Sequence, residues 1–103
     1  MISWAECAGF DWDDGNIGKN WEKHGVSDVE CEELFFNRPI VIGTDPAHSS
    51  GLERRWRALG RTDRGRYLLV AFTVRDGLIR VISARPMTNR ERRFYSNYEE
   101  SET

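Results

Sequence analysis

Residues 53–62 read Glu53-Arg54-Arg55-Trp56-Arg57-Ala58-Leu59-Gly60-Arg61-Thr62. Successive side chains of a β-strand point to opposite faces, so Trp56, Ala58 and Gly60 would share one side. The other side would carry the arginines at positions 55, 57 and 61. Neighbouring arginines on one face repel one another, and such a row is tolerated most easily where the face meets water or a polyanion. The stretch therefore predicts a strand with one apolar face and one cationic face.

Two further strands are predicted at about residues 66–74 and 78–84, and their turns fix the pairing. Asp76-Gly77 is a strong hairpin signal, which places Arg75 opposite Leu78 and Ala71 opposite Ile82. The loop at residues 63–65 suits a three-residue turn with glycine last, which places Arg61 opposite Tyr67. One face then holds a core of Trp56, Ala58, Leu68, Val70, Phe72, Val74, Ile79 and Val81. The opposite face holds Arg55, Arg57, Arg61, Tyr67, Leu69, Ala71, Thr73 and Arg80. A slip of one residue would exchange the faces of a whole strand, so the agreement of both registers supports this assignment.

The first forty residues predict an edge strand and two helices. Phe10-Asp11-Trp12 could be a short edge strand, followed by a helix from Asp13 or Asp14 to about His24. Ile17, Trp21 and His24 have the spacing of one helical face, which we expect to dock. A capping box, Ser27 to Glu30, opens a second helix that should end before Pro39.

The remaining elements predict one more strand and one more helix. Ile40 to Ile42 is β-branched and favours a strand. A capping box at residues 88–91 opens a C-terminal helix, which Phe94 and Tyr98 would dock, and residues 99–103 would form a solvated acidic tail. The expected fold is a single α+β domain over residues 1–103. Two N-terminal helices and a C-terminal helix would pack on an antiparallel sheet of about four strands.

The composition sets limits on the function. The chain has 103 residues, and none of its apolar runs approaches the roughly 20 residues that span a bilayer. Its acidic start does not resemble a secretory signal, so we expect a soluble, cytoplasmic protein without membrane contacts. Cys7, Cys31, His24 and His48 fit no zinc-binding spacing, so we expect no metal and no other cofactor.

The net charge of −2 conceals a strong asymmetry between two parts of the chain. Residues 1–33 carry nine acidic residues and two lysines, a balance of −7. Residues 34–103 carry thirteen arginines and eight acidic residues, a balance of +5. A local arginine field of this kind can attract a polyanion despite a low overall charge. The planar guanidinium group also favours two-point recognition of phosphate or carboxylate.

Several separated motifs resemble the BrnT family of toxins. They are Phe10-Asp11-Trp12-Asp13 with Asn16 and Lys19, Lys23-His24-Gly25-Val26-Ser27, Glu53-Arg54-Arg55, Gly60-Arg61-Thr62, Arg80-Val81-Ile82-Ser83-Ala84-Arg85 and Glu91-Arg92-Arg93-Phe94-Tyr95. The match covers most of residues 10–95. It departs from the family pattern in a longer, acidic start and in Asp28, where an aromatic residue is expected.

The resemblance implies a small endoribonuclease toxin of a type II toxin–antitoxin system. It also implies a RelE-like fold with the helices on one face of the sheet, and RNA cleavage that needs no metal. A BrnA-type antitoxin would neutralise the toxin, and the assembly would be a dimer or a heterotetramer with that antitoxin. Contact with operator DNA would come only through that antitoxin.

Metal-free cleavage of RNA requires a base for the 2′-hydroxyl proton and cations for the charge of the transition state. Among the arginines, Arg61 and Arg80 are the candidates for stabilising that charge. His24 or Glu53 is the candidate base, since a histidine titrates near neutral pH. For Arg80 an ion pair with Glu53 is an equally good interpretation, and for His24 a structural role at the helix end.

The remaining candidates would bind RNA without taking part in the chemistry. They are Lys19, Lys23, Arg55, Arg57, Tyr67 and Arg85. Tyr67 could stack on an unpaired base, while the lysines could equally belong to a solvated helix face. Two other functions stay open: a catalytically inactive module that only engages an antitoxin, and a structural partner whose arginines meet an acidic protein.

Overall fold

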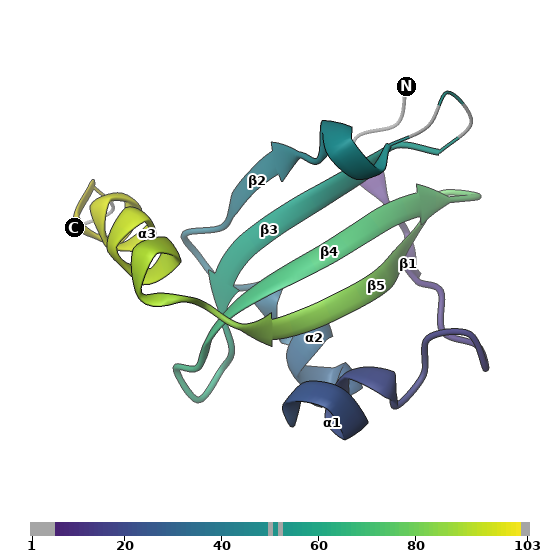
Figure 1. Ribbon diagram of the computed structural model, residues 1–103, viewed down its shortest axis with the longest axis horizontal. Helices are drawn as coiled ribbons and strands as arrows, with labels where there is room; N and C mark the ends of the chain where they lie inside the picture. The colour runs from purple at the N-terminus through teal and green to yellow at the C-terminus, as the bar shows by residue number, and fades with distance from the viewer. Residues whose placement is uncertain (1–5, 50, 52, 102–103) are drawn as a thin grey trace.

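Five strands form one mixed sheet in the order β1-β5-β4-β3-β2, shown in Figure 1. The computed structural model describes residues 6–49, 51 and 53–101. The strands are β1 (Gly9–Phe10), β2 (Val41–Thr44), β3 (Arg55–Arg61), β4 (Tyr67–Arg75) and β5 (Leu78–Pro86). The helices are α1 (Lys19–His24), α2 (Asp28–Leu34) and α3 (Asn89–Ser101), with a 3-10 turn at Pro46–His48. No described helix is long and apolar enough to cross a bilayer.

The α+β class and the three helices are confirmed, but the prediction of a purely antiparallel sheet of about four strands is wrong. The sheet has five strands, and β1 pairs with β5 in the parallel sense, with Gly9 opposite Leu78. A strand of only two residues carries no period that could reveal its direction. The direction is shown by the register, since the next residue, Phe10, lies opposite Ile79, and Asp11 N–H donates to Ile79 O at 2.8 Å.

The pairing of β3, β4 and β5 confirms most of the predicted register. Arg61 lies opposite Tyr67, and Arg75 lies opposite Leu78. The prediction of Ala71 opposite Ile82 is wrong, because a bulge inserts Ile82 and brings Ser83 opposite Ala71. A bulge adds one residue to one strand and shifts every later pair, which alternation alone does not reveal.

The apolar face of the sheet packs against α2. The buried cluster there combines residues of α2 and its flanks with the predicted inward positions of the strands. Its members are Val26, Cys31, Leu34, Phe35, Ala58, Leu68, Val70, Phe72, Ile79, Val81 and Ala84. The capping box at the start of α2 is present: Ser27 Oγ accepts from Glu30 N–H, and Glu30 accepts from Ser27 N–H. The predicted core face of the sheet is therefore the face that α2 covers.

At Gly60 the sheet lies close against α2. A Cβ atom added there would lie 2.7 Å from Leu34 Cγ, well inside van der Waals contact. Gly60→Ala is therefore expected to lower the free energy of unfolding by ~1–3 kcal/mol, as overpacked core sites do. Urea denaturation measures the effect. Gly43→Ala on the neighbouring strand β2 is the control, because its Cβ would meet nothing within 4 Å. Equal stability of the two variants would contradict this close approach.

The predicted docking face of the first helix is wrong. Ile17 and His24 are exposed, and Trp21 keeps 63% of its surface accessible. Buried instead are Asn16 and Asn20, which bind the free edge of β5 on either side of its bulge. Asn16 Nδ2 donates to Val81 O at 3.0 Å, and Asn20 Oδ1 accepts from Ala84 N–H at 2.9 Å. An unpaired strand edge offers backbone groups that must be satisfied, and here two amide side chains take the place of a strand.

Helix α1 is also shorter than predicted, because the chain from residue 14 to residue 18 forms turns. Gly18, with φ of 70°, precedes the helix in the left-handed region. Its N–H donates to the carboxylate of Asp28, 3.0 Å from Oδ2. Asp28, where the family resemblance implies an aromatic residue, thus links the start of α1 to α2.

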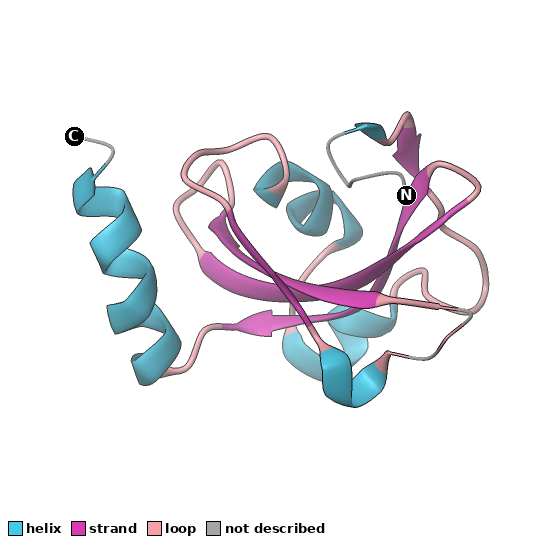
Figure 2. Ribbon diagram, turned by 90° about the horizontal axis from the view of Figure 1, so that it is seen from above, coloured by secondary structure: helices cyan, strands magenta, loops and turns pink. Residues whose placement is uncertain are grey.

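Helix α3 lies on the opposite face of the sheet from α2, so the expectation that all helices cover one face is wrong. Tyr95 is fully buried and packs with Leu59 and Leu69. These two leucines belong to the face of the sheet opposite the α2 core, which we call the outer face. Phe94 and Tyr98, predicted to dock the helix, remain 50% and 41% exposed. Figure 2 shows α3 at one end of the strands, apart from the other helices.

Candidate active site

The cationic face predicted from the strand alternation is present. Arg55 lies opposite Thr73, which lies opposite Arg80, so these three share one row across the sheet. Arg61 and Tyr67 form another row, six residues further along β3. At about 3.3 Å per residue the two rows are about 20 Å apart. Arg61 and Arg80 therefore lie on the same face but are too far apart to contact one phosphate group together.

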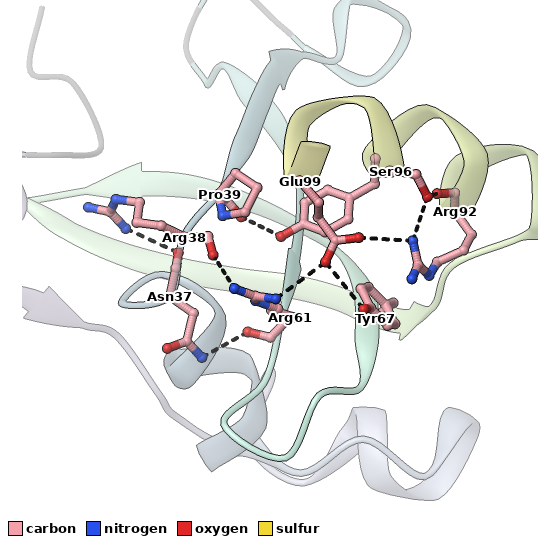
Figure 3. Close-up of polar contacts among 9 residues, drawn as sticks. Asn37, Arg38, Pro39, Arg61, Tyr67, Arg92, Ser96 and Glu99 are labelled. Carbon is pink, nitrogen blue, oxygen red and sulfur yellow. Dashed lines mark hydrogen bonds and ion pairs between the residues drawn. The ribbon is translucent and has the colours of Figure 1, made fainter. Parts of the chain in front are cut away.

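A cluster of charged and phenolic side chains surrounds Arg61 where α3 crosses this face (Figure 3). Arg61 Nη1 donates to Glu99 Oε2 at 3.3 Å, and Arg61 Nη2 donates to Arg38 O at 2.8 Å. The backbone carbonyl of Arg61 accepts from Asn37 Nδ2 at 3.0 Å. The guanidinium group is thus held in one orientation, while the Arg61 side chain keeps 42% of its surface accessible to a ligand.

Glu99 is the centre of this cluster. Its Oε2 also accepts from the Tyr67 hydroxyl at 3.2 Å, and its Oε1 accepts from Arg92 Nη1 at 3.1 Å. The Arg92 guanidinium lies over the Tyr67 ring, 3.5 Å from the ring centroid, which is a cation–π contact. An ionised carboxylate has about four acceptor positions, and three are filled here, so one remains for a further donor. We call Arg61, Tyr67, Arg92 and Glu99 the Glu99 cluster.

Two anchors position α3 and with it the Glu99 cluster. Tyr95 donates its hydroxyl hydrogen to Pro39 O in the interior, and burial raises the pKa of this phenol to about 12. At the start of the helix, Arg85 donates two hydrogen bonds to Glu91, 2.8 and 2.9 Å long. These hydrogen bonds raise the pKa of Arg85 and lower that of Glu91. The predicted capping box is also present, since Thr88 Oγ1 accepts from Glu91 N–H at 3.2 Å.

Arg80 is occupied by carboxylates of the N-terminal segment. Its Nη2 donates to Asp13 Oδ1 at 2.9 Å, and its Nη1 lies 3.5 Å from Asp11 Oδ2. The hydrogen bond lowers the pKa of Asp13 and raises that of Arg80. Glu53, the other candidate at this end of the sheet, accepts from Arg75 Nη2 at 2.7 Å. The structure thus places Arg80 and Glu53 at the end of the face remote from the Glu99 cluster.

The candidates on α1 lie away from the Glu99 cluster. Lys19, Lys23 and His24 are exposed on a helix that runs beside the free edge of β5, whereas α3 stands near β2 and β3. Among the described residues, no hydrogen bond or ion pair joins His24 to Glu99, whose partners are Arg61, Tyr67 and Arg92. A catalytic role for His24 and RNA binding by the lysines remain predictions from the sequence alone.

Arg55 and Arg57 are the cations of this face that have no carboxylate or hydrogen-bonding side-chain partner within the described ranges. Each ion pair of the face involves another arginine, namely Arg61, Arg75, Arg80, Arg85 or Arg92. Arg57 lies between Gly43 of β2 and Ala71 of β4, whose small side chains leave space around its guanidinium. These two arginines are thus available to an anionic ligand.

Sequence reasoning missed Glu99, which it left in a solvated tail, and Arg92, which it named only as part of a family motif. The helix runs to Ser101, so residue 99 belongs to it and faces the sheet. One signal was present: Arg92, Tyr95 and Glu99 are spaced by three and four residues, which places them on one side of a helix. Alternation in β3 and β4 did identify Arg61 and Tyr67 as neighbours.

The fold and the site define a class: a small α+β protein whose sheet presents a cationic face, with a carboxylate held among arginines at one end. The chain matches the family model of the ribonuclease toxin BrnT of type II toxin–antitoxin systems over residues 12–91. It therefore belongs to the BrnT family. A search of curated proteins found no match to the chain.

Within the described residues, no group of three or more histidine, cysteine, aspartate and glutamate side chains is arranged to hold a metal ion. Cys31 is buried, and burial raises the pKa of its thiol to about 12, so it is an inert member of the core. The charges of the Glu99 cluster also disfavour a bound metal ion, since two guanidinium groups beside a carboxylate oppose the approach of a cation.

Proposed function

We propose that this protein is a metal-independent endoribonuclease toxin and that the Glu99 cluster is its active site. The single observation that carries the proposal is a carboxylate held between two arginines and a tyrosine hydroxyl on the outer face of the sheet. These are the groups that RNA cleavage by the 2′-hydroxyl requires: a proton acceptor, cations for the phosphorane and a proton donor.

The roles follow from the positions of the groups. Glu99 would accept the 2′-hydroxyl proton through its remaining acceptor position. Arg61 and Arg92 would stabilise the extra negative charge as the 2′-oxygen attacks phosphorus. Tyr67, whose hydroxyl lies 3.2 Å from Glu99, would donate a proton to the departing 5′-oxygen. Arg55 and Arg57 would bind phosphates further along the RNA.

The test is cleavage of RNA by the purified protein in the presence of EDTA. We expect cleavage to survive chelation and to produce 2′,3′-cyclic phosphate ends, because the 2′-oxygen displaces the 5′-oxygen. An RNA with 2′-O-methyl groups throughout should resist cleavage. Loss of activity with EDTA, restored by a divalent ion, would contradict the metal-free mechanism.

A comparison of Arg61→Ala with Arg80→Ala decides which end of the face is catalytic. Arg61→Ala should lose about 10²–10³-fold in cleavage rate, as for the removal of one group that stabilises charge in a transition state. A similar or larger loss in Arg80→Ala, with Arg61→Ala active, would move the site to the Arg80 end.

The alternative function, an inactive module that only engages an antitoxin, is favoured by one observation. Arg61, Arg80 and Arg85 are each already neutralised by a carboxylate of this chain. Under that alternative the wild-type protein cuts no RNA under any condition and still binds its partner. Under the proposed function, a BrnA-type antitoxin inhibits by covering the Glu99 cluster.

A further inference from the structure

Beside the Glu99 cluster, a groove of about 350 Å³ runs between α3 and the outer face of the sheet. Leu59 and Leu69 line it together with residues 41–44 of β2, and Phe94 and Tyr98 line it from α3. The two rings lie against each other at a centroid distance of 5.4 Å. Both are about half exposed, so a large aromatic area faces solvent in the groove.

The charged groups at the groove suit an anionic ligand. Arg57 lines the groove and, among the residues that the structure describes, has no ion pair. The one carboxylate in the lining is Glu91, whose two oxygens already accept from Arg85. An entering anion therefore meets a free guanidinium and a neutralised carboxylate.

The groove is also continuous with the proposed active site. Leu59 and Leu69 line it and also pack against Tyr95. Tyr98 is followed directly by Glu99, and Arg57 lies four residues from Arg61 on the same face of β3. At about 3.3 Å per residue that separation is about 13 Å. One extended ligand can therefore contact the groove and the Glu99 cluster together.

We propose that this groove binds an unpaired nucleobase of the RNA substrate, next to the cleaved phosphate. The base stacks on the face of one of the two rings, Phe94 or Tyr98, which are inclined by 56°, and the other ring meets its edge. A phosphate flanking the base pairs with Arg57. Aromatic side chains beside a cationic track are the usual means of holding single-stranded RNA without reading its sequence. The inference rests on the proposed function, which supplies the RNA.

The test measures binding rather than cleavage, with a short 2′-O-methyl oligoribonucleotide that cannot be cut. Phe94→Leu and Tyr98→Leu keep apolar bulk but remove the flat ring, so the protein should stay folded. Each is expected to weaken binding about 5- to 100-fold, the usual effect of losing one stacked base. The loss should vanish for an oligonucleotide in which one nucleotide lacks its base. Trp21→Leu, at an aromatic on α1 that is even more exposed, is the matched control and should bind as the wild type does.

Arg57→Gln adds an independent measurement. It should reduce the slope of log affinity against log salt by about 0.7, the contribution of one phosphate contact on a single strand. Wild-type affinity in both leucine variants would overturn the groove assignment, and so would an equal loss with the abasic oligonucleotide. Leucine variants that lose affinity for a protein partner, and not for RNA, would also overturn it.

These outcomes separate the groove from the proposed function. If the wild-type protein cuts RNA and the groove variants bind and cut equally well, the groove has no role in base binding and the ribonuclease assignment stands. If the wild-type protein binds the oligonucleotide through Phe94 and Tyr98 but cuts no RNA, base binding in the groove is supported and the ribonuclease assignment is refuted.

Discussion

Glu99→Gln is expected to lower kcat/KM for RNA cleavage by about 10²–10⁴-fold, the usual contribution of a general base. Glutamine has the same shape, and its one oxygen can still accept from Arg61 or from Arg92, but its amide cannot take the proton of the 2′-hydroxyl. The measurement is cleavage of a short RNA over a range of pH.

Glu100→Gln is the matched control, because it removes the same charge from the next residue of α3, which is exposed. It should leave kcat/KM within a small factor of the wild type. The Glu99 variant itself should remain folded, since its ion pairs involve half-exposed arginines and such pairs contribute about 0–1 kcal/mol.

Two results would contradict the assignment of Glu99 as the base. Cleavage by Glu99→Gln at the wild-type rate would show that Glu99 has only a structural role, holding α3 against the sheet. Cleavage faster than the wild type would mean that the carboxylate occupies the place of the substrate phosphate and competes with it for Arg61.

Tyr95→Ala is expected to produce the largest loss of stability, ~3–5 kcal/mol, as for the truncation of other buried aromatic side chains. Tyr95 is fully buried between α3 and the sheet, where it packs with Leu59 and Leu69. A domain of this size is stable by about 5–15 kcal/mol, so the variant would lose a large part of its free energy of unfolding. Urea denaturation monitored by circular dichroism measures it.

Tyr95→Phe separates the hydrogen bond from the packing. It keeps the ring but leaves Pro39 O, which accepts the Tyr95 hydroxyl, without that donor. The expected loss is ~1–3 kcal/mol. Tyr98→Ala, one turn further along the helix and 41% exposed, is the control and should cost much less.

Hydrogen exchange then tests whether Tyr95 fastens α3 to the sheet. In Tyr95→Ala the amides of residues 89–101 should exchange faster, while those of β3 to β5 stay protected. Cleavage should fall as well, because Arg92 and Glu99 leave the sheet together with the helix. Protection of α3 equal to the wild type would show that the Arg85–Glu91 pair and the Glu99 cluster suffice to hold it.

The outer face of the sheet illustrates how much the sequence could predict. Alternation in β3, together with two turn signals, placed Arg61 beside Tyr67 and put Arg55 and Arg80 on the same face, as the structure has them. The same register also gives the separation of about 20 Å between the row of Arg61 and the row of Arg80. Alternation could not predict the partner of Arg80, because Asp13 is 67 residues away in the chain.

Helices α1 and α3 illustrate what the sequence could not predict. In both, the more apolar residues were expected to dock, yet Trp21, Phe94 and Tyr98 are exposed. Asn20 docks instead, because a backbone N–H of β5 needs a partner. Tyr95 docks because its hydroxyl reaches Pro39 O. Both docking partners lie more than 50 residues away in the chain.

The sequence by itself determined the local structure: the strands with their two faces, the hairpin registers as far as the bulge, and the capping boxes of α2 and α3. These depend on alternation, helical period and turn chemistry, which act over a few residues. Only the tertiary structure decided that α3 crosses the cationic face and brings Glu99 to Arg61, 38 residues away. The docking of a helix depends on unsatisfied polar groups and space on distant strands, and no local pattern encodes them.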